Sequence, residues 1–305
     1  MKKYGFPYKG SKNKLAEKIV KLFPDAENFY DLFCGGCAIT HRALIENRWK
    51  NYVINDIDSR CPKLFLDAIN GKFKNETKWI SREDFFKLKD DDGYVAFCWS
   101  FGNNTKNYMY SKEIEPYKKA LHYAIVFNEY SLGKELGVDL SVVDGIKGVS
   151  NRRLFLQKYL KNNNIGKDSP LKGSIEISCI LQNLSRLESL ESLERLERLE
   201  RLESLCKSYD EIEIKPNSII YCDIPYKNTD KYNNIDFDHE AFYNWCKNQT
   251  ELCFISSYEM TEDFIPIAEF NHRCTLSCKN QATIEKVFIP KHQLELYKTC
   301  LSACI

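Results

Sequence analysis

The stretch "FYDLFCGGCAIT", residues 29–40, carries the strongest indication of the fold. Its apolar start is typical of a buried strand, and the glycines Gly35 and Gly36 that follow predict a tight turn. The next letters, "AITHRALIEN", have helical character, and "NYVIND" (51–56) reads as a second strand closed by polar residues. A strand, a turn, a helix and a strand in this order form the unit of an open parallel α/β sheet.

The sequence on either side extends this pattern. "SKNKLAEKIVKLFP" has an N-cap candidate in Ser11 and stops at Pro24, which predicts a helix. Three later apolar runs have the length of strands and would complete the sheet. They are "SIIYCDI" (218–224), "ELCFISSY" (251–258) and "IEKVFIP" (284–290).

Length and composition bound the class of protein. The 305 residues suffice for one large domain or two of moderate size, and 43% hydrophobic with 29% charged residues is ordinary for a soluble globular protein. The formal net charge is only +1, so a polyanion must be met by a local basic patch. The polar start and the absence of apolar runs of about 18 residues argue against a signal peptide and a membrane span. We therefore expect a cytoplasmic protein.

Thirteen cysteines raise the question of a redox or metal site. Cys34 and Cys37 form a C-x-x-C, which fits a redox pair, half of a zinc site or a turn with incidental cysteines. A zinc site could draw further ligands from His272 and Cys274. Six isolated cysteines, several inside apolar runs, are expected to be small buried side chains: Cys61, Cys98, Cys179, Cys222, Cys246 and Cys253.

Residues 61–173 differ in amino-acid composition from the sequence on either side. Charged and aromatic residues mix there, and "LKNNNIGKDSPLKG" closes the segment with the composition of a loop. We interpret it as a largely helical insertion.

A low-complexity segment follows, in which leucine recurs at every third position from Leu181 to Leu205. A step of three leaves successive side chains about 60° apart on an α-helix, so the leucines wind around it. Glutamate and arginine pairs at i, i+4 favour the α-helix: Glu191/Arg195, Glu194/Arg198 and Glu197/Arg201. We interpret the repeat as a helical spacer of variable length, outside the chemistry.

Two further features suggest a site. Asp56 stands twenty residues after Gly36 at the end of the second strand, where a carboxylate can accept hydrogen bonds from ribose hydroxyls. In "SIIYCDIPYKNT" (218–229), an apolar run typical of a strand leads to Asp223, and Pro225 and Tyr226 follow in a short loop. An acid, a backbone carbonyl and an aromatic ring together suit an amino group on a flat base.

These motifs resemble the DNA adenine methylase (Dam) family, D12 class, of S-adenosylmethionine-dependent methyltransferases. "YKGSK" (8–12) resembles its aromatic-x-G-G-K segment, "DLFCGG" its methionine-binding turn, and "NDID" its ribose-binding acid. "DIPY" (223–226) matches the catalytic D-P-P-Y, and "EKVFIP" resembles the last core strand. The resemblance implies a Rossmann-like α/β methyltransferase sheet, formed by residues 1–60 and 174–305, with a mostly helical target-recognition domain inserted at 61–173.

The implied activity is that of a site-specific adenine DNA methyltransferase (EC 2.1.1.72), which moves the methyl group of S-adenosylmethionine to the 6-amino group of a flipped adenine in double-stranded DNA. Asp223 and the carbonyl of Ile224 would accept the amino hydrogens, and Tyr226 would stack on the base. The implied catalytic residues are Asp223, Ile224, Pro225 and Tyr226. The implied cofactor-binding residues are Tyr8, Lys12, Asp31, Phe33, Gly35, Gly36, Asp56 and Asp223. The expected DNA-binding residues are Lys9, Asn103, Asn104, Lys106, Asn107, Tyr108 and Lys112.

Alternatives remain open at this point. Ile224 replaces the first proline of D-P-P-Y and Ser11 replaces a glycine of the amino-terminal segment, so a catalytically impaired DNA-binding relative also fits. A protein-glutamine methyltransferase shares an x-P-P-Y pocket, although its motif starts with Asn. The C-x-x-C fits a thioredoxin-like motif, which would leave Asp56 and Asp223 unexplained. Whether a cognate restriction endonuclease accompanies the protein is also open.

Overall fold

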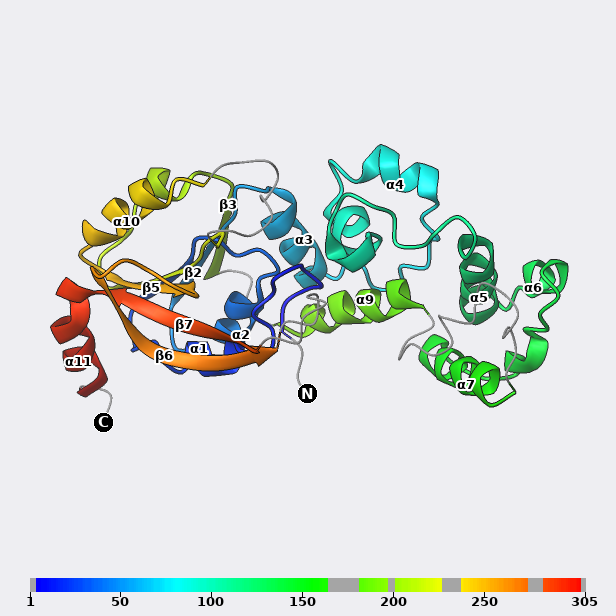
Figure 1. Cartoon of the computed structure of the whole chain (residues 1–305). Helices are drawn as coiled ribbons and strands as arrows, with labels where there is room; N and C mark the ends of the chain where they lie inside the picture. The colour runs from blue at the N-terminus through cyan, green and yellow to red at the C-terminus, as the bar shows by residue number, and fades with distance from the viewer. Residues whose placement is uncertain (1–3, 164–180, 197–200, 227–236, 274–281, 303–305) are drawn as a thin grey trace. The chain divides into compact units, whose positions relative to one another are not determined.

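A computed structural model describes residues 4–163, 181–196, 201–226, 237–273 and 282–302 of the chain (Figure 1). The chain divides into two compact units. The first, which we call the sheet unit, comprises residues 1–6, 10–70 and 193–305; the second, the helical unit, comprises 7–9 and 71–192. Composition alone places the boundaries near 60/61 and 173/174. The helix α3 (Arg60–Ile69) groups with the sheet unit because it contacts strand β3 and buries Leu64 and Phe65.

The described part of the sheet unit contains a seven-stranded sheet of order β3-β2-β1-β4-β5-β7-β6. The strands are β1 (Asn28–Asp31), β2 (Asn51–Asn55), β3 (Leu202–Leu205), β4 (Ser218–Asp223), β5 (Leu252–Ser257), β6 (Phe264–Arg273) and β7 (Ala282–Pro290). Strands β1 to β5 run parallel to one another, whereas β7 runs antiparallel to both β5 and β6. The predicted α/β class is confirmed, and each of the five strand-like runs forms a strand.

Burial on both faces explains why these runs are almost continuously apolar. All four residues of β1 are buried, and β1 lies between β2 and β4. Phe29 packs against Trp49 with ring centroids 5.1 Å apart, in an aromatic cluster that includes Phe23 and Phe254. Central parallel strands are thereby fixed in place, and their carboxyl ends meet at one edge.

The remaining α-helices in the described part of the sheet unit are α1 (Ala16–Val20), α2 (Ala38–Glu46), α10 (His239–Lys247) and α11 (Leu294–Ser302). Helix α2 follows the glycine turn as predicted. The predicted start of α1 near Ser11 is wrong, because the α-helix begins only at Ala16. Residues 12–15 instead form a turn in which the N–H groups of Leu15 and Ala16 donate to the carbonyl of Lys12. No helix in the described ranges combines the length and hydropathy needed to cross a membrane.

The described residues of the helical unit confirm that the insertion is largely helical. Its helices are α4 (Arg82–Leu88), α5 (Glu115–Phe127), α6 (Ser131–Glu135), α7 (Val149–Asn162) and α9 (Gln182–Glu191), with one turn of π-helix at Tyr94–Cys98. Leu121, Ile125, Leu156 and Leu160 lie in one buried cluster. Leu181, the first leucine of the repeat, belongs to the same cluster.

The leucine repeat does not form one helix. It is α-helical in α9, continues as a 3₁₀ helix at Ser192–Arg195, and ends as strand β3. The interpretation as a helical spacer is therefore wrong at its end, since β3 pairs in parallel with β2. The tetrapeptide Leu-Glu-Ser-Leu is helical at 187–190 and extended at 202–205, so the surroundings decide its conformation. Glu191 and Arg195 are not in one α-helix; the other two predicted pairs include residues outside the described ranges.

Candidate active site

Three carboxylates stand at the carboxyl edge of the sheet. Asp31 ends β1, Asp56 follows β2, and Asp223 ends β4, and these three strands are neighbours. In open α/β sheets, ligands bind at this edge. The negative charge of Asp223 raises the pKa of both Asp31 and Asp56, after the larger effect of burial. The structure thus brings together acids that are far apart in the sequence.

Asp56 ties the glycine turn to the end of β2. Its Oδ2 accepts a hydrogen bond of 2.8 Å from the N–H of Gly35, and its Oδ1 accepts one of 2.9 Å from the N–H of Asp58. Burial raises its pKa to about 6 despite these two bonds. Gly35 has φ +43°, a conformation that a glycine adopts without the strain of a side chain.

The amino-terminal segment supports the same turn from the other side. The N–H of Phe6 donates to the carbonyl of Gly36 at 2.9 Å, and the N–H of Gly5 donates to Nδ1 of His41 at 2.8 Å. Burial lowers the pKa of His41 to about 4, so the ring is neutral near pH 7 and Nδ1 can accept. The sequence analysis missed Gly5 and His41, since neither belongs to a recognisable motif.

Asp31 is a buried acid with one unused oxygen. The hydroxyl of Thr40 donates to its Oδ2 at 2.6 Å, while Oδ1 has no hydrogen-bond partner within the described ranges. Burial raises the pKa of Asp31 to about 7. A buried carboxylate oxygen without a donor is costly, which suits a site that receives a cationic group from a ligand. S-adenosylmethionine carries an ammonium group on its methionine part, so the residues present fit the expected cofactor.

The D-I-P-Y segment meets Lys12 of the amino-terminal segment. The Nζ of Lys12 lies 2.7 Å from Oδ1 and 2.8 Å from Oδ2 of Asp223, and only 8% of Lys12 is exposed. Burial raises the pKa of Asp223, and the ammonium group opposes that effect. Ile224 has its side chain in the buried cluster that contains Phe242, so the residue that replaces proline is held by packing.

Glu285 on β7 also belongs to the group of side chains around Asp223 and Lys12, and the sequence analysis missed it. Its Oε1 accepts a hydrogen bond of 2.5 Å from the hydroxyl of Tyr226 and lies 3.8 Å from Nζ of Lys12. The signal was present in the alternation of the strand: Glu285 has the same parity as Val287 and Ile289, which are both fully buried. A glutamate on the inward side of a strand points to a paired or functional acid.

The cysteines of the turn do not behave as a redox pair. Cys34 and Cys37 are free and buried, and burial raises the pKa of both thiols. A reactive thioredoxin-like cysteine needs a lowered pKa, so this reading is wrong. Of the zinc alternative, Cys274 lies outside the described residues. Within those residues, no group of three or more His, Cys, Asp and Glu side chains is arranged to hold a metal ion.

Two other predicted cofactor-binding residues, Phe33 and Tyr8, belong to different units. Phe33 is partly buried, with its ring centroid 5.6 Å from that of Tyr209. Tyr8 groups by its contacts with the helical unit, where its ring lies 5.3 Å from Phe97. Lys9 groups with the same unit and is exposed.

Five of the seven predicted DNA-binding residues lie on one loop of the helical unit, and the other two are Lys9 and Lys112. A single bridge joins Ser100 to Tyr108 and closes the loop between them. Tyr108, one of the predicted DNA-binding residues, is buried, and its hydroxyl donates to the carbonyl of Ile80 at 2.8 Å. It supports the loop from inside.

The polar residues of this loop have two kinds of role. The amide of Asn103 donates to the carbonyl of Phe97, and Oδ1 of Asn104 accepts from the backbone N–H groups of Lys106 and Asn107. These two amides shape the loop. The side chains of Lys106, Asn107 and Lys112 are exposed, as is Phe101 at 66%.

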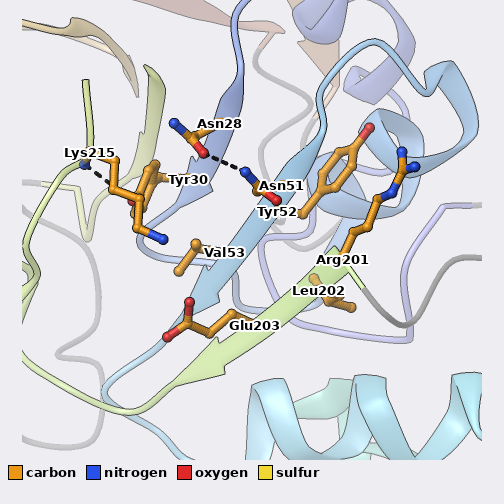
Figure 2. Close-up of a pocket in the computed structure, with 9 residues that line it drawn as sticks. All are labelled: Asn28, Tyr30, Asn51, Tyr52, Val53, Arg201, Leu202, Glu203 and Lys215. Atoms are coloured by element: carbon orange, nitrogen blue, oxygen red, sulfur yellow. Dashed lines mark hydrogen bonds between the residues drawn. The ribbon is translucent and has the colours of Figure 1, made fainter. Parts of the chain in front are cut away.

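A cavity of about 190 Å³ lies elsewhere in the sheet unit (Figure 2). It is lined at the amino ends of the strands by residues such as Asn28, which starts β1, and Asn51, which starts β2. The amide of Asn51 donates to Oδ1 of Asn28 at 2.8 Å. None of the motif residues lines this cavity, and the chemistry points to the opposite edge.

One comparison with known proteins identifies the family. The family model described as D12 class N6 adenine-specific DNA methyltransferase matches residues 8–251, which is most of the chain. A search of curated proteins finds no match. The match runs from the aromatic residue of "YKGSK" through the glycine turn and Asp56 to the D-I-P-Y segment. The chain belongs to the D12 class of S-adenosylmethionine-dependent N6 adenine-specific DNA methyltransferases.

Proposed function

We propose that this methyltransferase carries out its reaction at the carboxyl end of β4, on an adenine flipped out of the duplex. The observation that carries the proposal is the position of Asp223 at the end of that strand, bound to Lys12 and next to Tyr226. Asp31 and Asp56 stand at the ends of the neighbouring strands, where a nucleoside cofactor would lie beside the base. The family match makes the target an adenine, so a protein-glutamine substrate is not proposed.

Asp223 and the carbonyl of Ile224 have the chemistry that the adenine amino group requires. The lone pair of that nitrogen is delocalised into the ring, so the nitrogen is a poor nucleophile. Two acceptors that bind its hydrogens favour the pyramidal form and free the lone pair. As the new N–C bond forms, the bond between that carbon and the sulfonium sulfur would break, and one of the two amino hydrogens leaves as a proton. Asp223 is the base within reach of that proton. Tyr226 provides a ring on which the flipped base stacks, and Pro225 stiffens the loop.

The cofactor is proposed to lie between the glycine turn and the strand ends. S-adenosylmethionine supplies an electrophilic methyl group on a sulfonium centre. The unused Oδ1 of Asp31 binds the ammonium group of its methionine part, and Asp56 accepts from the ribose hydroxyls while it holds the turn. The other residues assigned to the cofactor site are Tyr8, Lys12, Phe33, Gly35, Gly36 and Asp223.

The helical unit is proposed to be the target-recognition domain. Lys9, Lys106 and Lys112 are exposed cations that suit phosphate contacts, and Asn107 is an exposed amide that suits a base edge. The proposed location is the cytoplasm, as the compartment in which the enzyme would meet its DNA. A restriction endonuclease specific for the unmethylated target is the proposed partner, because methylation would protect that target from it.

The experiment is to sequence, with a method that detects methylated bases, the DNA of cells that express the protein. Wild type should mark adenine in one short sequence, and Asp223→Ala should mark none. The purified Asp223→Ala variant should still bind duplex DNA, since affinity comes mainly from phosphate contacts elsewhere. Wild type that binds S-adenosylmethionine and DNA but marks no adenine would establish an impaired relative. Asp223→Ala with full activity would refute the proposed centre.

A further inference from the structure

Glu285 is a buried carboxylate that the proposed reaction does not use. Only 2% of it is exposed, although glutamate is rarely buried without a specific partner. Its Oε1 accepts from the hydroxyl of Tyr226 at 2.5 Å and lies 3.8 Å from Nζ of Lys12. Tyr226 and Lys12 also donate to Asp223. The two carboxylates therefore compete for the same two donors.

The contact between Lys12 and Asp223 obstructs the role proposed for Asp223. The ammonium group engages both carboxylate oxygens, at 2.7 and 2.8 Å. An adenine amino group that approaches Asp223 meets oxygens that already bind a full positive charge and are weakened as acceptors. Lys12 must withdraw from at least one oxygen for the base to be held.

Lys12 cannot withdraw into water from its present position, because only 8% of its surface is exposed. A buried ammonium group without a partner is strongly unfavourable, so it needs another anion close by. Among the residues that the structure describes, Asp223 and Glu285 are the two carboxylates within 4.0 Å of Nζ. A shift of about 1 Å would bring Nζ within hydrogen-bond distance of Glu285.

We propose that Glu285 is a positioning residue that receives the ammonium group of Lys12 when adenine binds, which leaves the oxygens of Asp223 to the amino group of the base. The inference rests on the proposed role of Asp223. The Tyr226 hydroxyl holds Oε1 of Glu285 in place for the transfer.

The electrostatics of Glu285 agree with such a transfer. Burial raises its pKa above the usual range, the ammonium of Lys12 lowers it, and the charge of Asp223 raises it again. Movement of the Lys12 ammonium group from Asp223 towards Glu285 therefore favours the ionised form of Glu285. The ammonium group of Lys12 keeps a carboxylate partner throughout the transfer, and the amino group of the base takes its place at Asp223.

The alternative is that Glu285 only packs and accepts the hydrogen bond from Tyr226. Two substitutions separate the roles. Glu285→Gln keeps the size and the acceptor but removes the charge, whereas Glu285→Asp keeps the charge and shortens the side chain. A positioning role through charge predicts more activity in the aspartate variant than in the glutamine variant. A packing role predicts the reverse order.

The measurement is kcat and KM on an unmethylated duplex that contains the target sequence, with the Kd of S-adenosylmethionine from calorimetry. We expect Glu285→Gln to lower kcat about 100-fold, the effect of a misplaced catalytic group, with KM and Kd within about threefold of wild type. Glu285→Asp should stay within about tenfold of wild-type kcat. Wild-type kcat in Glu285→Gln, or the reverse order of the two variants, would overturn the inference.

Glu269→Gln is the matched control. Glu269 lies on β6 of the same hairpin, is 54% exposed and pairs with Lys286 at 3.4 Å, so the same change of charge should leave kcat unchanged. Tyr226→Phe should cost less than Glu285→Gln, because the anion remains. If Glu285→Gln does not fold, a folded Glu285→Asp as inactive as Asp223→Ala would overturn the inference. Full activity of Asp223→Ala would instead refute the proposed centre on which it rests.

Discussion

Gly5 lies so close to the carbonyl of Gly36 that a Cβ on Gly5 would approach that oxygen to 2.1 Å. The same Cβ would lie 2.8 Å from the nitrogen of Ala38, the first residue of α2. Both neighbours are backbone atoms of the proposed cofactor turn, so neither can yield without moving the turn. The amino terminus thus sets the shape of a turn that belongs to β1 and α2.

Gly5→Ala is therefore expected to weaken S-adenosylmethionine binding by at least tenfold. Gly137→Ala is the control, because Gly137 also has a positive φ, +72°, but nothing within 4 Å of its Cβ. Both variants should lose about 1–2 kcal/mol of stability from the left-handed conformation. Gly5→Ala should lose more stability than Gly137→Ala because its Cβ meets the backbone of the turn, and only Gly5→Ala should lose cofactor affinity. Calorimetric titration and thermal unfolding measure the two quantities. Unchanged affinity in folded Gly5→Ala would show that the turn tolerates the shift.

Cofactor affinity should rise with pH through Asp31. Burial raises the pKa of Asp31 to about 7, and an ammonium group binds the ionised form. The Kd of S-adenosylmethionine should fall as pH increases from 5.5 to 7.5, with a slope of up to tenfold per unit. Asp31→Asn should bind S-adenosylmethionine more weakly, and its Kd should no longer change with pH near pH 7. The pH dependence that remains should be centred near pH 6 and come from Asp56, whose pKa is about 6.

The stability of the free protein should show the opposite trend. The folded-state pKa of Asp31 lies above its value of 3.8 in an unfolded chain, so the folded state holds the proton more tightly. The contribution of Asp31 to the free energy of unfolding is thus most favourable below about pH 4 and declines until about pH 7. Asp31→Asn should be stabilised relative to wild type at pH 7.5, in urea unfolding without cofactor. A destabilised variant would mean that Asp31 is ionised and paired.

Ile224 should matter for stability through its side chain and for activity through its carbonyl. Because it is 2% exposed, Ile224→Ala should cost about 2–4 kcal/mol, and Ile224→Val about 0.5–1.5 kcal/mol. Ile224→Pro keeps the carbonyl and stiffens the loop, so its rate of methyl transfer should equal or exceed that of wild type. A folded Ile224→Pro variant with no activity would show that the active site of this enzyme requires isoleucine at this position rather than the family's proline.

The leucines of the repeat should differ in their contribution to stability. Leu190 in α9 is fully buried, whereas Leu202 in β3 is partly exposed. Leu190→Ala should cost about 2–4 kcal/mol in urea unfolding, and Leu202→Ala less than about 1.5 kcal/mol. A uniform helical spacer predicts equal costs for the two substitutions, which would contradict the observed division.

Replacing Cys34 and Cys37 together by alanine should leave methyl transfer intact. Both thiols are buried and protonated, so their loss should lower stability by only a few kcal/mol. Activity measured with and without a zinc chelator, before and after the substitutions, tests this. Collapse of activity in a folded double variant would restore a functional role for the pair.

Much of the fold followed from local pattern. Strands β1, β2, β4, β5 and β7 are apolar because both faces of the sheet are covered, and this leaves a clear mark in the sequence. Strand β3 was missed because its four residues repeat letters that are helical in α9; only pairing with β2 makes them extended. Strand β6 was missed because it lies at the edge, contains Pro266 and carries polar residues.

The site was predictable where one motif supplied the residue. Asp56 and Asp223 follow strands and could be placed at the same edge from the order of elements. Strand alternation assigns Glu285 to the inward side of β7 but does not reveal its partner, because Tyr226 is 59 positions away and only the antiparallel pairing of β7 with β5 brings the two together. The burial of Tyr108 likewise depends on a contact with Ile80 that no local pattern encodes.

The central place of β1 has a consequence for how the protein is made. Asn28 of β1 bonds to the carbonyl of Pro216, 188 positions later, just before β4 begins. At about 5–20 residues per second, the ribosome delivers that partner roughly 10–40 s after β1 has emerged. During this interval β1 and β2 present apolar faces without their sheet neighbour, while the helices encoded between them and β4 become available. Synthesis of this enzyme thus includes a long period in which its future core is exposed, and a molecular chaperone that binds extended apolar segments would meet it then.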